Sequence, residues 1–241
     1  MRVAIVRIAR GLWERCEIGT WLVACYADPI VPADLGFGLD LLDVEPTPLA
    51  RNKAVVRARQ AGLGANDVLI MIDNDMVPPE PTTAIGDNFY NRAVRFLTDH
   101  PGPHVFASPY RGAAPKRSVQ VIDVQGTRYT PERAAACRHI DQVAGIGTGL
   151  FACNMAAFDA IEKAGHLPWF EYAYLDPPCN ADMASTEDIV FCDKLNRAGG
   201  RIFCDWESWS GHAKIEIVGK PEAPVAASTR NGVSCKEVAH A

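Results

Sequence analysis

The chain has 241 residues, of which 48% are hydrophobic and 22% charged, with a formal net charge of −5. A chain of this length can bury a large core without disulfides or metal, and its composition excludes disordered, collagen-like and coiled-coil proteins. The negative charge argues against nucleic acid as the main partner. No apolar run approaches the roughly 20 residues of a membrane span, so none is predicted.

The cysteines and the N-terminus indicate the compartment. The eight cysteines include no Cys-x-x-Cys pair, and those at positions 25, 153, 192 and 204 lie in apolar segments, which is typical of free thiols. The first ten residues contain three arginines and no small-residue cleavage site follows them. We therefore expect a first strand there instead of a signal peptide, and a cytoplasmic protein.

Short apolar strands alternate with helical stretches through the first third of the chain. This pattern predicts strands over residues 2–8, 39–44 and 67–73, and helices over residues 20–26 and 49–61. Thr47 and Pro48 indicate the start of the second helix, with Thr47 as its capping residue. The continuous apolar run over residues 67–73 predicts a strand buried on both faces of a mainly parallel sheet.

The α/β alternation continues to about residue 205. It predicts helices over residues 89–97, 155–163 and 187–198, and strands over residues 104–108, 118–124, 139–143, 149–153 and 201–205. Residues 109–117 form a basic loop, and the aromatic residues 166–185 form a long loop of the kind that carries function. We expect one domain over residues 1–219 and a loose tail over residues 220–241.

Asp73, Asn74 and Asp75 lie at the carboxyl end of the most apolar predicted strand, where ligands bind in open α/β sheets. Two carboxylates one residue apart suit a hard divalent cation, which takes oxygen ligands and often bridges to substrate phosphates. The alternative is a plain turn, because Asp and Asn side chains also bond the local backbone.

Two further positions can carry chemistry. Glu187 and Asp188 open a predicted helix after Thr186, where capping and the helix dipole favour acidic residues in any case. A carboxylate there that faces a crevice can also take a proton from an attacking hydroxyl. His212 follows a strand, and a lone histidine is more often structural, although an imidazole beside two carboxylates would complete a site for an ion such as Mn²⁺.

Several common nucleotide and hydrolase motifs are absent. Residues 145–149 read Gly-Ile-Gly-Thr-Gly, but residue 150 is Leu, where a dinucleotide fingerprint needs its third Gly. The chain also has no P-loop and no Gly-x-Ser-x-Gly nucleophile elbow. Hydride transfer, P-loop phosphoryl transfer and esterase chemistry are therefore not supported.

The order of the motifs resembles that of a glycosyltransferase of the GT-A fold, closest to the family-2-like group, over about residues 40–215. The resemblance is carried, in chain order, by Ala50-Arg51-Asn52, Asp73-Asn74-Asp75, Gly147-Thr148-Gly149, Thr186-Glu187-Asp188 and Gly211-His212. It implies an α/β fold of GT-A type, a three-layer sandwich with a mainly parallel central sheet. It also implies transfer of a sugar from a UDP- or GDP-sugar to the hydroxyl of a glycan or other acceptor.

The resemblance also implies roles for individual residues. Asp73 and Asp75 match the Asp-x-Asp motif, which holds Mn²⁺ or Mg²⁺ against the diphosphate; Asp75 is the first choice for a direct ligand, and His212 adds to the set. Glu187 and Asp188 match the pair from which inverting members draw their base, and Asp188 is the better match. The nucleotide sugar would contact Arg51, Asp73, Asn74, Gly147, Thr148 and Trp169. Trp169 either stacks on the sugar or packs under its loop.

Two other functions stay open. A sugar-nucleotide nucleotidyltransferase uses a related sheet and a metal, and would favour a Gly-rich basic loop after the first strand, of which Arg10, Gly11 and Arg15 are a thin version. A non-catalytic carbohydrate-binding accessory would keep the fold and lose site residues. Both carboxylates of the Asp-x-Asp motif, the Glu-Asp pair and His212 are all present, which argues against that loss.

Overall fold

Helices and strands alternate along the chain, as the sequence predicts. The computed structural model describes residues 1–9, 18, 21–22, 25, 34–42, 46–79, 88–112, 118–174 and 183–213. Its elements, in chain order, are β1 (Arg2–Ala9), β2 (Asp34–Leu42), α2 (Thr47–Gln60), β3 (Val68–Asp73), β4 (Met76–Val77), α3 (Phe89–Asp99), β5 (His104–Ala107), β6 (Val121–Ile122), α4 (Pro131–Ala136), β7 (Ile140–Val143), β8 (Gly145–Ile146), β9 (Leu150–Asn154), α5 (Met155–Lys163), β10 (Ala173–Tyr174), β11 (Met183–Ser185), α6 (Glu187–Arg197), β12 (Arg201–Asp205) and β13 (Gly211–His212).

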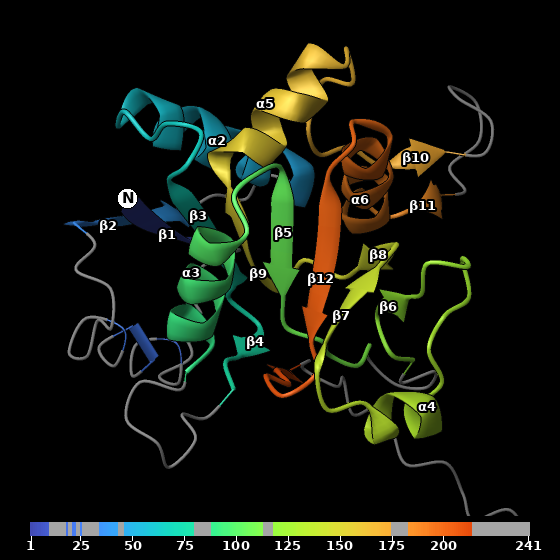
Figure 1. Cartoon of the computed structure of the whole chain (residues 1–241). Helices are drawn as coiled ribbons and strands as arrows, with labels where there is room; N and C mark the ends of the chain where they lie inside the picture. The colour runs from blue at the N-terminus through green and yellow to red at the C-terminus, as the bar shows by residue number, and fades with distance from the viewer. Residues whose placement is uncertain are drawn as a thin grey trace, which may run out of the picture.

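The central sheet has seven strands in the order β2-β1-β3-β9-β5-β12-β7 (Figure 1). Strands β2, β1, β3, β5 and β12 run in one direction, and β9 and β7 run against them. Because β9 is antiparallel to β3, its first residue, Leu150, pairs with Ile72 near the carboxyl end of β3. The predicted α/β fold with a mainly parallel central sheet is confirmed.

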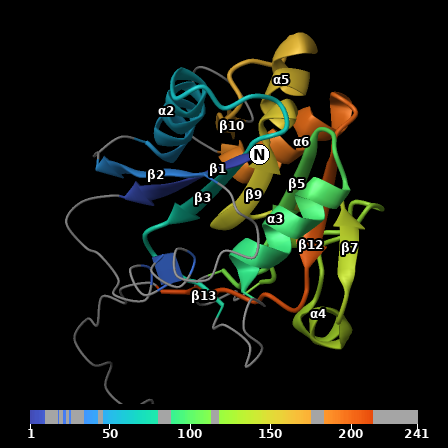
Figure 2. The same ribbon diagram turned by 60° about the vertical axis from the view of Figure 1, so that its left-hand side comes forward.

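Helices cover both faces of this sheet (Figure 2). Alternate side chains of β3 explain why, since Ile70 and Ile72 join a core with α3, whereas Leu69 and Met71 join a second core with α2, α5 and α6. A strand whose neighbouring residues are apolar on both sides needs a cover on each face. The result is the three-layer arrangement that the resemblance implies.

The helix ends show where local rules hold and where they do not. Helix α2 begins at Thr47 with Pro46 as its N-cap residue and no side-chain cap, so the prediction of Thr47 as the cap is wrong by one residue. Pro48 lies in the first turn, as expected. Thr186 is the N-cap residue of α6, and Gly199, with a φ of 79°, follows its end.

The region between β5 and β9 differs most from prediction. The strand expected over residues 118–124 is reduced to β6, which pairs with β8 outside the central sheet. Helix α4 lies in the polar stretch between the strands predicted over residues 118–124 and 139–143, where no helix is predicted. The sequence contains a helix-start signal here, a threonine followed by a proline. In the structure, Thr130 caps the helix by accepting a hydrogen bond from the Arg133 backbone N–H at 3.2 Å, and Pro131 is the first helical residue.

Some expectations lie outside the described residues. These are most of the helix over residues 20–26, the basic residues Lys116 and Arg117, the loop with Arg10, Gly11 and Arg15, and the tail over residues 220–241. The five described cysteines are all free thiols. Among the described residues, no helix has the length and apolar character that crossing a membrane requires.

Candidate active site

A pocket of about 240 Å³ lies where β3 and β1 end. Strand β3 ends at Asp73, and the turn after it leads into β4, which pairs with β13 and so brings His212 opposite Met76. The start of α6 closes the pocket. Its walls include all the residues predicted for metal binding and catalysis, namely Asp73, Asp75, Glu187, Asp188 and His212. Arg51 and Asn74, which are predicted to contact the nucleotide sugar, also line it.

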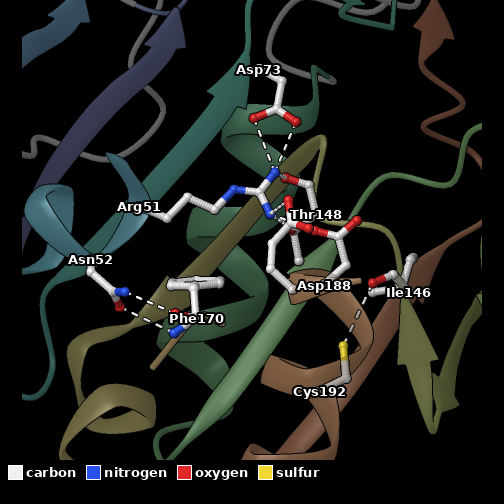
Figure 3. A network of polar contacts seen from close by, with 9 residues as sticks. Arg51, Asn52, Asp73, Ile146, Thr148, Phe170, Asp188 and Cys192 are labelled. Atoms are coloured by element: carbon white, nitrogen blue, oxygen red, sulfur yellow. Dashed lines mark hydrogen bonds and ion pairs between the residues drawn. The ribbon is translucent and has the colours of Figure 1, made fainter. Parts of the chain in front are cut away.

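Arg51 connects the carboxylates of this pocket (Figure 3). Its side chain is 1% exposed, and its Nη2 donates to both carboxylate oxygens of Asp73, at 3.0 and 2.8 Å. Its Nη1 donates to the Asp188 carboxylate and to the Thr148 hydroxyl, and lies 3.5 Å from Glu187 Oε1. Such a planar fork can bind two carboxylates at fixed positions, which a lysine cannot do.

The electrostatics of the pocket follow from burial and from these charges. Burial raises the pKa of the Asp73 carboxyl to about 6, while the Arg51 guanidinium opposes the rise. Burial alone would lower the pKa of Arg51, but the surrounding carboxylates hold it above its ordinary value. Burial also raises the pKa of the Tyr110 hydroxyl, so this group stays protonated at neutral pH. The pocket thus holds several carboxylates around one buried cation.

The Asp188 carboxylate is held through one of its two oxygens. Its Oδ1 accepts hydrogen bonds from Arg51 and from the Thr148 hydroxyl, whereas its Oδ2 bonds to none of the described residues. The side chain is 15% exposed and lines the pocket. One oxygen therefore holds the carboxylate in place, and the other can reach a ligand.

Asp75 and His212 face each other across the turn after β3. The His212 Nδ1 lies 3.2 Å from the Arg111 carbonyl, which can only accept, so Nδ1 carries the proton. In the neutral ring, Nε2 is then an acceptor, and it lies 3.3 Å from Asp75 Oδ2. Two acceptors at this distance suit a shared cation. The Tyr110 ring packs edge-on against the imidazole, with centroids 5.0 Å apart.

The structure does not assemble the predicted three-ligand metal set. Asp75 and His212 lie together, but the fork of Arg51 engages both oxygens of Asp73. No group of three or more His, Cys, Asp or Glu side chains in the described part of the chain is arranged to hold a metal ion. Two protein ligands, with the remaining positions left to water and substrate phosphates, are a common arrangement for Mg²⁺.

The predicted role of Trp169 is also corrected. Its side chain is buried, its indole N–H donates to the Phe158 carbonyl at 3.0 Å, and Arg59 covers its ring at 4.9 Å. It does not line this pocket. The alternative, that Trp169 packs under its loop, therefore holds. Asn52 fixes the same loop, because its amide exchanges hydrogen bonds of 2.9 and 3.1 Å with the Phe170 backbone.

Comparison with known proteins finds similarity in the fold but not in the sequence families. No protein-family model matches the chain, and no curated protein matches it. The fold is similar to that of A197 from STIV. The match has a TM-score of 0.50 and 14% identity, and it covers 92% of this chain and 99% of A197. A crystal structure of GalNAc-T7 with UDP, GalNAc and Mn²⁺ matches at a TM-score of 0.46 and 14% identity, over 88% of this chain and 43% of GalNAc-T7. At this identity the likeness to A197 concerns the fold alone.

Sequence reasoning missed Tyr110 as a site residue. It lies shortly after β5, so the rule that placed Asp73 at a strand end also applies to it. A Cβ atom at Gly147 would lie 2.6 Å from two carbons of the Tyr110 ring, so only a glycine lets the turn before β9 approach this ring. The absence of a side chain at Gly147 thus leaves room for the Tyr110 ring, which packs against His212.

We expect Gly147→Ala to lower the free energy of unfolding by about 1–3 kcal/mol, because the new methyl group has to displace a buried ring. Urea denaturation measures the change. Gly64→Ala is the control, since a Cβ there meets no atom within 4 Å, and it should change stability by less than about 0.5 kcal/mol. Equal stability of the two variants would contradict the packing role of Gly147.

Proposed function

We propose that this protein is a metal-dependent glycosyltransferase of GT-A type, which moves a sugar from a UDP- or GDP-sugar to an acceptor hydroxyl. The observation that carries the proposal is Asp188, fixed through one carboxylate oxygen by Arg51 and Thr148 and able to reach a ligand through the other. A carboxylate held in this way is suited to act as general base. The ordered motifs of the sequence support the same reading.

The chemistry assigned to the chain is a single displacement. Asp188 takes the proton of the acceptor hydroxyl, the acceptor oxygen bonds to the anomeric carbon of the donor, and the bond from that carbon to the diphosphate breaks. The product then has the inverted configuration. NMR comparison of the anomeric configuration of donor and product tests this, and a retained configuration would exclude Asp188 as a base in direct displacement.

The donor diphosphate belongs in the first pocket. Asp75 and His212 are the residues that would hold Mn²⁺ or Mg²⁺, since a carboxylate oxygen and an imidazole nitrogen face each other there. When bound, such an ion supplies positive charge that stabilises the departing diphosphate. Asp73 lines the same pocket while it forms its ion pair with Arg51. Asn74 and Tyr110 form further parts of the pocket wall.

Calorimetric titration of UDP and of GDP, with and without Mn²⁺, tests the proposal directly. We expect one nucleotide to bind only with Mn²⁺, and Asp75→Asn to weaken this binding at least about tenfold, since the loss of a residue that merely orients a metal ligand already costs that much. Asp159→Asn is the control, because Asp159 is an exposed residue of α5 paired with Arg59.

The possible results separate the parts of the proposal. Binding of a nucleotide that is independent of Mn²⁺ and of Asp75 would contradict the metal site alone. Failure of both nucleotides to bind under any condition would contradict the glycosyltransferase assignment as a whole.

A further inference from the structure

A second pocket, of about 380 Å³, adjoins the first. Thr186 and Asp188 line both pockets, so the carboxylate assigned as base borders the two spaces. The volume of the second pocket lies in the range of small-molecule sites, about 300–1,000 Å³. A ligand bound there and a ligand in the first pocket can therefore meet at Asp188.

The walls of the second pocket differ in polarity. Ile122 and Ile189 form an apolar part, whereas Gln120, Arg128 and Ser185 offer hydrogen-bonding groups. Gly147, in the turn before β9, also lines the pocket and has no side chain to fill it. A ring with one apolar face and hydroxyl groups at its edge matches this distribution, as sugar rings do.

Two charged residues line this pocket, Asp188 and Arg128. A short hairpin presents it, because Arg128 bridges to Ile122 across an antiparallel pair. Its Nη1 donates to the Val119 carbonyl at 3.2 Å and to the Gln120 side-chain oxygen at 3.0 Å. The amide of Gln120 is itself fixed, because it donates to the Ser118 carbonyl at 3.0 Å. The guanidinium is therefore held in position before any ligand arrives.

The charge of Arg128 is not neutralised within the described part of the chain. No carboxylate of the described residues forms an ion pair with it, and its hydrogen bonds go to neutral oxygens. Six other arginines of the described residues each form an ion pair with a carboxylate, namely Arg2, Arg51, Arg59, Arg92, Arg133 and Arg197. A positioned guanidinium with donors to spare is suited to bind a carboxylate or phosphate group.

We infer that the second pocket binds the acceptor, and that this acceptor carries an anionic group, a carboxylate or a phosphate, which Arg128 binds while its hydroxyl reaches Asp188. This inference rests on the proposed function and adds the substrate class to it. The transfer step is unchanged: the hydroxyl proton goes to Asp188, the acceptor oxygen bonds to the donor sugar, and the nucleoside diphosphate leaves.

Ligand-observed NMR titrations of the full chain test the inference, with and without Mg²⁺ and UDP or GDP. The probes are methyl glucuronide, methyl glucoside and glucose 6-phosphate. We expect at least one of the two anionic probes to bind at least about tenfold more tightly than the neutral glucoside, because hydrogen bonds to charged groups are the stronger ones. The anionic probe that binds more tightly shows whether the acceptor group is a carboxylate or a phosphate.

Arg128→Gln should remove this preference, so that neither anionic probe binds more tightly than the neutral glucoside. Arg138→Gln is the matched control, since Arg138 is an exposed arginine that bonds only to backbone carbonyls and lines neither pocket; it should keep the preference. Equal binding of all three probes, or a preference that survives Arg128→Gln, would overturn the inference. If nucleotide still binds with Mn²⁺ in that case, the proposed function stands without the anionic acceptor.

Discussion

Replacing Asp188 by Asn should reduce sugar transfer by about 10²- to 10⁴-fold, the size of a general-base contribution. The amide oxygen of Asn can still accept from Arg51 and from the Thr148 hydroxyl, so the side chain keeps its place. The group that faces the ligand then becomes a donor and can no longer take a proton. The release of UDP or GDP from the donor, measured with saturating acceptor, gives the rate.

Glu187→Gln is the comparison for this experiment. Glu187 precedes Asp188 on α6, and its Oε1 lies 3.5 Å from Arg51, but it does not share the bond to Thr148. We expect a smaller decrease in rate than for Asp188→Asn, with nucleotide affinity retained in both variants. A larger loss in Glu187→Gln would move the role of base to Glu187.

Replacing Arg51 by Met should lower the free energy of unfolding by about 3–5 kcal/mol, the usual cost of removing one partner from a buried ion pair. The carboxylates of Asp73 and Asp188 would then face each other inside the pocket without their shared cation. Their side chains are 23% and 15% exposed, so water screens them only in part. Guanidinium or urea denaturation measures the loss.

Two variants control for the loss of an arginine as such. Arg57→Met removes an exposed arginine of the same helix and should change stability by less than about 0.5 kcal/mol. Arg51→Lys keeps the charge but not the planar fork, so we expect a loss between those of the two Met variants. A loss below about 1 kcal/mol in Arg51→Met would contradict the role of Arg51 as the shared partner of the two carboxylates.

The sequence predicts the fold and the grouping of the candidate residues around one pocket, because both depend on local patterns. The apolar run before Asp73 has to be a buried strand, and polar residues at its end have to face the edge of the sheet. The start of α6 at Glu187 follows from Thr186 and from the apolar spacing after it. These rules placed Asp73, Asp75 and Asp188 in one pocket.

The partners of these residues could not be predicted in the same way. Arg51 and Asp188 are 137 residues apart, and nothing in the local pattern of either indicates that they meet. The engagement of Asp73 by Arg51, which leaves Asp75 and His212 as the proposed metal pair, could not be predicted from local pattern either. Trp169 illustrates the same limit, since an aromatic residue in a loop has the same sequence pattern whether it binds a ligand or packs on Phe158.

The position of β9 affects how the protein folds. This strand inserts between β3 and β5, and Thr148, two residues before the strand begins, contacts Arg51 and Asp188. The pairing of β3 with β9 joins residues about 80 positions apart, and contacts of such separation form slowly. We therefore expect the pocket to be completed only when β9 pairs with both β3 and β5. A nucleotide that binds it recognises the finished fold, so it should slow unfolding and leave the early steps of folding unaffected.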